Sequence, residues 1–246
     1  MKRYAFTDLH GNYKLFKDIQ NYINKDDIVY CLGDNCDRGP DGIKIIQEML
    51  QDSRFHYILG NHEAMLLDAI QKGTINNEFT LQYFDKEDMK IFKHNGTLET
   101  LHAYMKLSQE EKKFIVESLS RLPVAIYLER KNGDTIFLSH AGCNPSDIGT
   151  LYPDFKFYWD RKHIAKEKWV YNDEDNNLYI IHGHTPVQAL PYYSKVFKNK
   201  LLNEIVCYCE GHKFDLDVCT PITNKIALFD LDTFEVIYLV DDTKLN

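Results

Sequence analysis

The sequence predicts an α/β fold with a largely parallel central sheet, and three observations point to it. The first 60 residues alternate short apolar runs with segments of helical periodicity, as in a β-α-β-α-β unit. After residue 123 the chain returns to short apolar runs of strand type. Five polar motifs directly follow apolar runs, so we expect them at the carboxyl ends of strands, where open α/β sheets form their sites.

The N-terminal unit is expected to contain three strands and two helices. Three short, largely apolar runs predict the strands: Arg3–Thr7, Ile28–Leu32 and Phe55–Leu59. Between them, Tyr13–Ile23 and Gly42–Leu50 carry apolar residues at helical spacing, which predicts a helix in each.

The middle of the chain, from about Ala64 to Leu122, is expected to form a helical insert within one domain spanning residues 1–246. Ser108 followed by Glu111 has the spacing of a capping box and predicts a helix start there. The later apolar runs predict strands at Val124–Glu129, Thr135–Leu138, Leu178–Ile181, Leu202–Cys207, Lys225–Phe229 and Glu235–Val240.

Composition excludes several classes of protein. With 44% hydrophobic and 27% charged residues, the chain has the balance of a globular protein. It has no apolar stretch near the roughly 20 residues that cross a membrane, and no secretory signal, so we expect a cytoplasmic protein. A formal charge of −8 without any run of Lys or Arg argues against general nucleic-acid binding. The oligomeric state is left open.

The polar motifs contain the groups that bind metals and phosphate. They read Asp8-Leu9-His10, Gly33-Asp34-Asn35-Cys36-Asp37-Arg38-Gly39, Gly60-Asn61-His62-Glu63, Ser139-His140-Ala141-Gly142 and His182-Gly183-His184-Thr185. Asp8 and His10 can bind one cation together, and both oxygens of the Asp34 carboxylate are available to bridge two cations. This set of oxygen and nitrogen ligands suits Mn²⁺, Fe or Zn²⁺ in a catalytic site.

The second half of the ligand set comes from later motifs. Asn61 supplies a neutral oxygen, and His140 supplies an imidazole nitrogen. Either His182 or His184 supplies another, and we favour His184, with His182 packed behind it. Two cations about 3.5–4 Å apart would activate a water molecule and hold phosphoryl oxygens.

The remaining polar residues fit the other needs of phosphate-ester hydrolysis. His62 can protonate the departing oxygen, and Asp37 can orient that imidazole and favour its charged form. Arg38 offers forked donors to phosphate. Arg161, within an aromatic segment, is expected to form a second phosphate contact, and Asn61 to contribute to phosphate binding.

The series DLHG, GDNCDRG, GNHE, SHAG and HGHT resembles the phosphoprotein phosphatase branch of the calcineurin-like metallophosphoesterases, particularly its compact bacterial and phage members. The resemblance implies a four-layer α/β/β/α sandwich with two mixed sheets. It also implies two metal ions, commonly Mn²⁺, and attack by a hydroxide that bridges them. Carried over, Asp8, His10 and Asp34 hold one ion, and Asp34, Asn61, His140 and His184 hold the other. Arg38 and Arg161 match the phosphate-binding arginines, and Asp37–His62 matches the proton-donating pair.

Two segments depart from the family's pattern. His94-Asn95-Gly96-Thr97 stands where many bacterial relatives have Asn-Gly-Gly, which leaves the contact made there open. Asp217-Val218-Cys219-Thr220 replaces a more usual Asp-Thr-Gly-like turn. Cys219 would then border the metals and could modulate activity, although a packing role is the simpler interpretation.

These observations favour a metal-dependent serine/threonine protein phosphatase. An alternative with the same site is the symmetrical hydrolysis of diadenosine tetraphosphate or related nucleotides, with an aromatic wall for adenine from Tyr83, Phe84, Phe92 and Tyr104. A third possibility is a metal-dependent binding or regulatory module without turnover, against which the intact His62–Asp37 pair argues.

Overall fold

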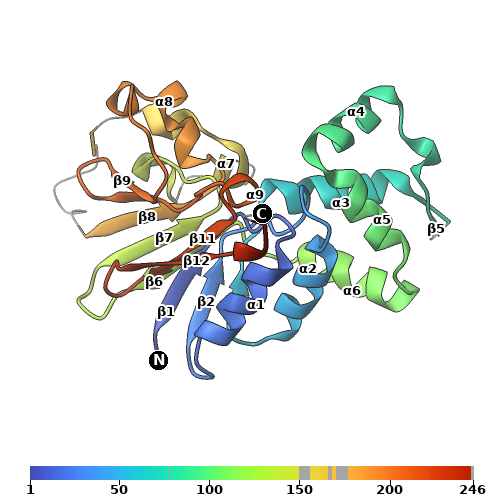
Figure 1. Ribbon diagram of the computed structural model, residues 1–246, viewed down its shortest axis with the longest axis horizontal. Helices are drawn as coiled ribbons and strands as arrows, with labels where there is room; N and C mark the ends of the chain where they lie inside the picture. The colour runs from blue at the N-terminus through green and yellow to red at the C-terminus, as the bar shows by residue number, and fades with distance from the viewer. Residues whose placement is uncertain (77, 150–155, 166–167, 170–176, 245–246) are drawn as a thin grey trace.

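Two five-stranded sheets lie face to face at the centre of the molecule (Figure 1). The structure is a computed structural model that describes residues 1–76, 78–149, 156–165, 168–169 and 177–244. Among these residues, every helix is too short or too polar to span a lipid bilayer.

The first sheet has the strand order β12-β11-β1-β2-β3. The strands β1 (Arg3–Phe6), β2 (Ile28–Cys31) and β3 (Phe55–Tyr57) are parallel to one another, as the N-terminal pattern predicts. β11 (Lys225–Asp230) pairs antiparallel with β1, and β12 (Val236–Val240) pairs antiparallel with β11. The carboxyl ends of β1, β2 and β3 therefore lie along one edge.

The second sheet has the order β6-β7-β8-β10-β9. β7 (Thr135–Ser139), β8 (Leu178–His182) and β10 (Lys213–Asp215) are parallel. β6 (Ala125–Glu129) and β9 (Val206–Tyr208) pair antiparallel at the two edges. The prediction of one largely parallel sheet is thus wrong for the molecule as a whole, because each sheet is mixed. The two mixed sheets agree with the sandwich that the family resemblance implies.

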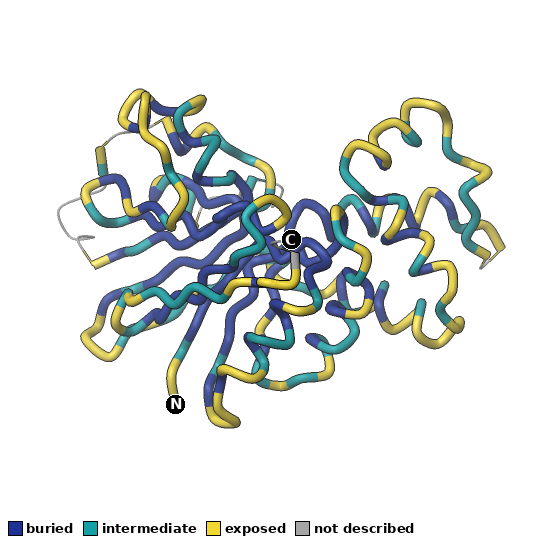
Figure 2. Tube along the Cα trace, viewed as in Figure 1, coloured by how far each residue is buried: buried dark blue, intermediate teal, exposed yellow. Residues whose placement is uncertain are grey.

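Hydrophobic side chains separate the layers. Ala5, Leu32, Leu138, Ile181 and Phe229 belong to a cluster of buried residues between the two sheets. A larger cluster joins the other face of the first sheet to α1 (Tyr13–Tyr22) and α2 (Gly42–Gln51). Smaller clusters cover the second sheet on the side of α7 (Lys156–Trp159) and α8 (Leu190–Tyr193). Figure 2 shows the inner strands of both sheets as the most buried part of the trace, whereas β6 and β12 are intermediate or exposed.

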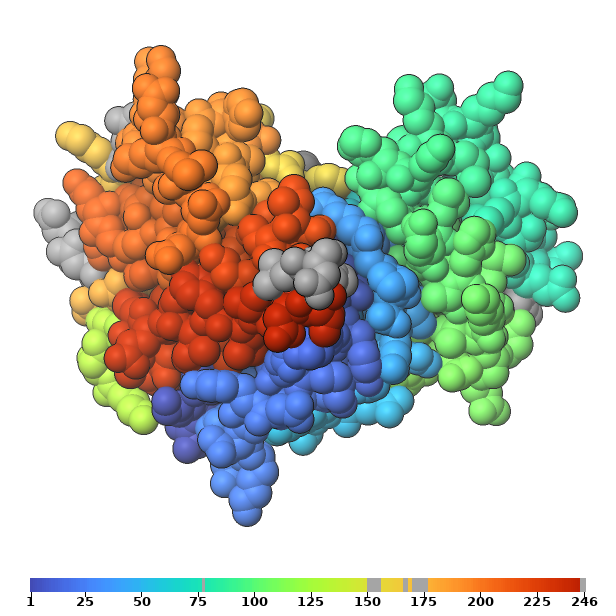
Figure 3. Space-filling model, viewed as in Figure 1, coloured from blue at the N-terminus to red at the C-terminus, as the bar shows by residue number. Residues whose placement is uncertain are grey.

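The expected helical segment begins at Asn61 rather than Ala64 and stands beside the sheets as a separate projection (Figures 1 and 3). It consists of α3 (Asn61–Gly73), α4 (Lys86–Asn95), α5 (Thr97–Met105) and α6 (Gln109–Leu119). The capping box that opens α6 is confirmed, since Glu111 N donates to Ser108 Oγ at 3.2 Å and Ser108 N donates to Glu111 Oε2 at 2.8 Å.

Several short elements complete the fold. A small hairpin, β4 (Thr74–Ile75) with β5 (Glu78–Phe79), and the helix α9 (Thr220–Thr223) were not expected from the sequence. Single turns of 3-10 helix lie at Leu81–Tyr83, Pro145–Asp147, Lys162–Ala165, Val187–Ala189, Lys195–Phe197 and Asp242–Lys244.

Candidate metal centre

Five loops meet at one place because each follows the carboxyl end of a parallel strand. Asp8 and His10 follow β1, Asp34 follows β2, Asn61 starts α3 after β3, His140 follows β7, and His184 follows β8. The loops of the two sheets are joined directly, since the backbone N–H of His184 donates to Asp8 Oδ2 at 3.0 Å. The convergence expected from the sequence is therefore present in the fold.

The backbone at this place is unusually strained. Six candidate residues have positive φ angles between 46° and 68°, a region that side chains other than glycine rarely adopt. These residues are Asp8, His10, Asp34, Asp37, Arg38 and His184. Strain of this kind costs roughly 1–3 kcal/mol per residue and is typical of functional sites.

Two groups of side chains have the spacing of metal ligands. Ligand atoms of His10, Asp34 and His62 lie within 4.8 Å of one another, and so do those of Asp34, His140 and His184. Asp34 is common to both groups. Asn61 adjoins the second group, with its Oδ1 at 2.9 Å from His140 Nε2. Asp8 adjoins the first, with its Oδ1 at 3.6 Å from His10 Nε2.

Two backbone carbonyls orient the rings of His10 and His140. His10 Nδ1 lies 3.0 Å from the carbonyl oxygen of Cys36, and His140 Nδ1 lies 2.7 Å from that of Leu32. When each Nδ1 donates its proton to a carbonyl, Nε2 keeps a free lone pair, which is the usual arrangement of histidines that bind metals.

Buried atoms without partners provide a test of whether a cation fits here. The Nε2 atoms of His10 and His184 are buried and have no hydrogen-bond partner among the described residues. A buried polar atom without a partner is costly, and a metal ion is one way to satisfy it. The residues present therefore fit two divalent cations.

The charges of the site favour ionised carboxylates. Burial opposes the ionisation of Asp8, but the nearby His10 ring and the charge of His140 outweigh it and lower the pKa of Asp8 to about 2. Burial likewise opposes ionisation of Asp34, whose pKa is held well below its usual value by His140 and His62. Burial disfavours protonated His140, yet Asp34 raises the pKa of His140 to about 9. The negative charge of the buried Asp8 and Asp34 carboxylates attracts cations to this place.

His62 and Asp37 form a closely held pair. His62 Nδ1 lies 2.7 Å from Asp37 Oδ2. The hydroxyls of Thr97 and Thr100 each donate to one oxygen of Asp37 at 2.8 Å, which fixes that carboxylate. Arg38 Nη2 lies 3.3 Å from the other ring nitrogen, His62 Nε2.

The same contacts explain the departure at His94–Thr97. Thr97 bonds to Asp37, and Gly96 packs so closely on the backbone of Arg38 that a Cβ at position 96 would clash with it. Thr97 and Thr100 were not predicted as part of the site. Their spacing of three residues on a helix was the available signal.

The structure separates the roles of His182 and His184. His184 Nδ1 lies 3.2 Å from His140 Nε2, whereas His182 Nε2 lies 2.7 Å from the hydroxyl of Tyr208, and His182 belongs to neither ligand group. Burial and the charges of His140 and Arg161 hold the pKa of His184 well below its usual range. Arg161 therefore acts electrostatically on the site from the turn after α7.

Two further carboxylates were missed in the sequence. Glu63 accepts hydrogen bonds from the backbone N–H groups of Asp34 and Asn35, both at 2.8 Å, and so fixes the loop after β2. Asp217 is buried beside the site, and burial with the charge of Asp8 raises its pKa well above the usual value. Burial and Asp217 also raise the pKa of Cys219 to about 11, which keeps its thiol protonated.

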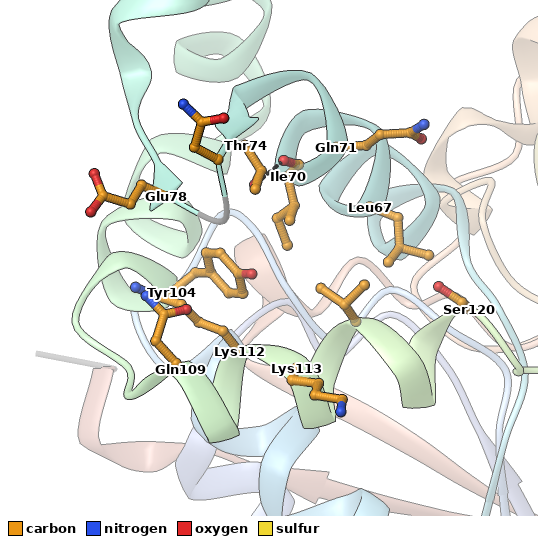
Figure 4. Close-up of a pocket in the computed structure, with 12 residues that line it drawn as sticks. Leu67, Ile70, Gln71, Thr74, Glu78, Tyr104, Gln109, Lys112, Lys113 and Ser120 are labelled. Atoms are coloured by element: carbon orange, nitrogen blue, oxygen red, sulfur yellow. Dashed lines mark hydrogen bonds between the residues drawn. The ribbon is translucent and has the colours of Figure 1, made fainter.

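A cavity of about 920 Å³ lies apart from this centre, between α3 and α6 (Figure 4). Leu67, Ile70 and Val116 give it an apolar surface, and Lys112 and Glu78 lie at its edge. Its lining, taken from the described residues, includes none of the candidate site residues. Of the aromatic residues considered for an adenine wall, Tyr104 lines this cavity although it is largely buried, and Phe92 is buried in the core.

Comparisons with known proteins agree with this geometry. The model of the calcineurin-like phosphoesterase family matches residues 1–219. The asymmetrical bis(5'-nucleosyl)-tetraphosphatase PrpE of Oceanobacillus iheyensis is 28% identical over 76% of this chain and 78% of its own length.

Other matches are more local. The symmetrical bis(5'-nucleosyl)-tetraphosphatase of Wigglesworthia glossinidia brevipalpis is 39% identical over 37% of this chain and 36% of its own. Serine/threonine-protein phosphatase 2 of Escherichia coli is 36% identical over 28% and 33%. The solved structure of a metallophosphoesterase from Sphaerobacter thermophilus covers 98% of this chain and 88% of its own, with a TM-score of 0.55 and 16% identity, and shares its fold.

Proposed function

The chain belongs to the calcineurin-like phosphoesterase family and is a hydrolase of phosphoester bonds, and we propose that it works with two divalent cations. Asp8, His10 and Asp34 would hold one cation, and Asp34, Asn61, His140 and His184 the other. The observation that carries this proposal is the place of Asp34 in both ligand groups. The oxygen and nitrogen donors suit Mn²⁺, with Fe or Zn²⁺ as alternatives.

His62 is proposed as the proton donor rather than a metal ligand, although its ring lies near His10 and Asp34. Its Nδ1 is directed at Asp37, and the guanidinium of Arg38 lies beside its Nε2. A cation bound at Nε2 would be repelled by Arg38, whereas a phosphate oxygen would be attracted there. His62 Nε2 is then placed to protonate the departing oxygen, with Asp37 holding the ring.

The arginines position the substrate. Arg38, from its place beside His62, and Arg161 would bind the non-bridging phosphate oxygens together with Asn61. The cations, when bound, would lower the pKa of a water molecule and neutralise the charge that develops on phosphate.

We propose dinucleoside tetraphosphates as the substrate class. The support is the extent of similarity to PrpE, which covers 76% of this chain, together with the second, local match to a symmetrical enzyme. The sequence alone favoured phosphoproteins, and the similarity to the E. coli phosphatase keeps a serine/threonine protein phosphatase as the second candidate.

The test is a substrate profile of protein loaded with Mn²⁺. Diadenosine tetraphosphate should be consumed with a higher kcat/KM than phosphoserine and phosphothreonine peptides. The products identify the bond that is cut, since symmetrical cleavage gives two ADP and asymmetrical cleavage gives AMP and ATP. A preference for phosphopeptides would establish the second candidate instead. Bound metal without turnover of any phosphoester would mean a binding module.

A further inference from the structure

Trp159 is an exposed aromatic residue next to the metal centre. Its indole is 40% exposed, while Phe157, two residues earlier on the same short helix, is buried. The ring centroids of Phe157 and Phe137 lie 5.5 Å apart, so Phe157 anchors α7 to the second sheet. The backbone N–H of Ala141, next to His140, donates to the carbonyl of Phe157 at 2.7 Å. Trp159 is therefore held on a fixed element but does not serve the core.

The indole lies against a candidate metal ligand. The ring centroids of Trp159 and His184 are 6.2 Å apart, with an angle of 85° between the ring planes. His184 itself is only 5% exposed, so Trp159 lies on the solvent side of a buried ligand. A large aromatic surface left open at this position is available to a bound molecule.

The charges nearby indicate what kind of molecule this is. Arg161 follows Trp159 by two residues, in the turn after α7. The chain thus holds a planar ring against the candidate metal ligand His184 and carries a guanidinium two residues after that ring. A nucleotide presents the matching groups in the same order, because its base can stack on the indole while its phosphates meet Arg161 and the cations.

We propose that Trp159 is the platform on which a nucleobase of the substrate stacks, and that it selects nucleoside polyphosphates over other phosphates. This inference rests on the proposed function, since it assigns a specificity residue to the same site. It requires no part of the cavity between α3 and α6.

The kinetic test compares two substrates that share a phosphoanhydride chain and differ in whether they carry nucleosides. Inorganic tetraphosphate has the phosphoanhydride chain of diadenosine tetraphosphate without the nucleosides. For Trp159→Ala, the ratio of kcat/KM for diadenosine tetraphosphate to that for tetraphosphate should fall roughly 5- to 150-fold, mainly through KM. Trp159→Phe should restore most of the ratio, because phenylalanine keeps an aromatic face.

Tyr192 provides a matched control, since it is an aromatic residue on α8 that is 89% exposed. Tyr192→Ala should leave the ratio unchanged. A ratio that Trp159→Ala does not alter would overturn the proposal. A selective loss of activity on phosphotyrosine peptides would also overturn it, because the indole would then contact a tyrosyl ring instead of a nucleobase.

A binding measurement separates this inference from the proposed function. The chain has two tryptophans, and Trp169→Phe leaves Trp159 as the sole indole. Diadenosine tetraphosphate should quench the fluorescence of that variant, whereas inorganic tetraphosphate should not. Quenching without hydrolysis would refute the proposed substrate but support the platform. Hydrolysis without quenching would refute the platform alone.

Discussion

At the scale of single residues, His62 is the group whose position most directly indicates catalysis. Asp37 fixes its Nδ1, and Arg38 lies beside its Nε2. We expect His62→Asn to lower kcat roughly 10²- to 10⁴-fold, the usual contribution of general acid catalysis. Metal analysis of the same sample should still find two ions per chain, because the proposed ligands are untouched.

Thr100→Val provides a graded companion to that variant. It removes one hydroxyl that holds Asp37 but leaves the His62 ring in place. Turnover should fall less than in His62→Asn. If His62→Asn lost bound metal in parallel with turnover, His62 would be a metal ligand instead of the proton donor.

Asp34 should control the loading of both metal positions. Its carboxylate belongs to both ligand groups, and Asn in its place has one oxygen and no charge. We expect Asp34→Asn to retain well under two Mn²⁺ per chain after dialysis, as measured by elemental analysis. Asp26→Asn, which changes an exposed carboxylate, is the control. Two fully loaded positions in Asp34→Asn would contradict the bridging role.

At the scale of elements, local signals located most helices and strands. The Ser108–Glu111 capping box marked the start of α6 because both of its hydrogen bonds form within four residues. β10 was missed because its three residues include Lys213 and Asp215, which are buried only through contacts with distant segments. α3 begins earlier than expected because Asn61 and His62 belong both to the site and to the helix.

The turn before α9 carries the other departure from the family's pattern. Cys219 adopts a φ of 61°, where a side chain is strained and glycine is not. This explains why a glycine-like turn is more usual there. We expect Cys219→Val to be less stable than Cys219→Gly by about 1 kcal/mol. The backbone strain of valine at this φ destabilises the first variant, and the larger unfolded-state entropy of glycine offsets part of that strain.

Urea unfolding of the two Cys219 variants measures this difference. Equal midpoints would show that the strain is relieved elsewhere. Cys219→Gly should also keep most of its turnover, because the thiol that it removes is protonated. A large loss of turnover would instead give Cys219 a role at the metals.

At the scale of the whole molecule, the site was predictable wherever its residues follow strands. Asp8, Asp34 and Asn61 could be placed together because the parallel strands β1, β2 and β3 end at a common edge. Thr97 and Thr100 could not, since their contact with Asp37 depends on how α5 packs against a loop about 60 residues earlier. The substrate was not predictable from these motifs, because they describe the phosphate and the metals alone.

The interior beneath the site couples the stability of the fold to pH. His163 is fully buried, and burial with the charges of Lys213 and His182 holds its pKa well below 6.5. In the unfolded chain its pKa returns to about 6.5. Below that pH the unfolded state takes up a proton that the folded state does not, so this residue's contribution to the free energy of unfolding decreases as the pH falls.

Asp215 and Asp217 have the opposite effect on the free energy of unfolding as the pH falls. Burial is the main cause that raises the pKa of each carboxyl well above its usual value. The effect of His163 must therefore be measured as a difference between the wild type and a variant.

His163→Gln can keep a donor to the carbonyl of Ala141, the partner of His163 Nε2 at 2.6 Å. Its destabilisation relative to the wild type should shrink as the pH falls from 6.5 to 5, with a slope that approaches about 1.4 kcal/mol per pH unit. Urea unfolding of metal-free protein measures it, with the exposed His102→Gln as control. A destabilisation that stays constant across this range would show that His163 is protonated in the folded protein.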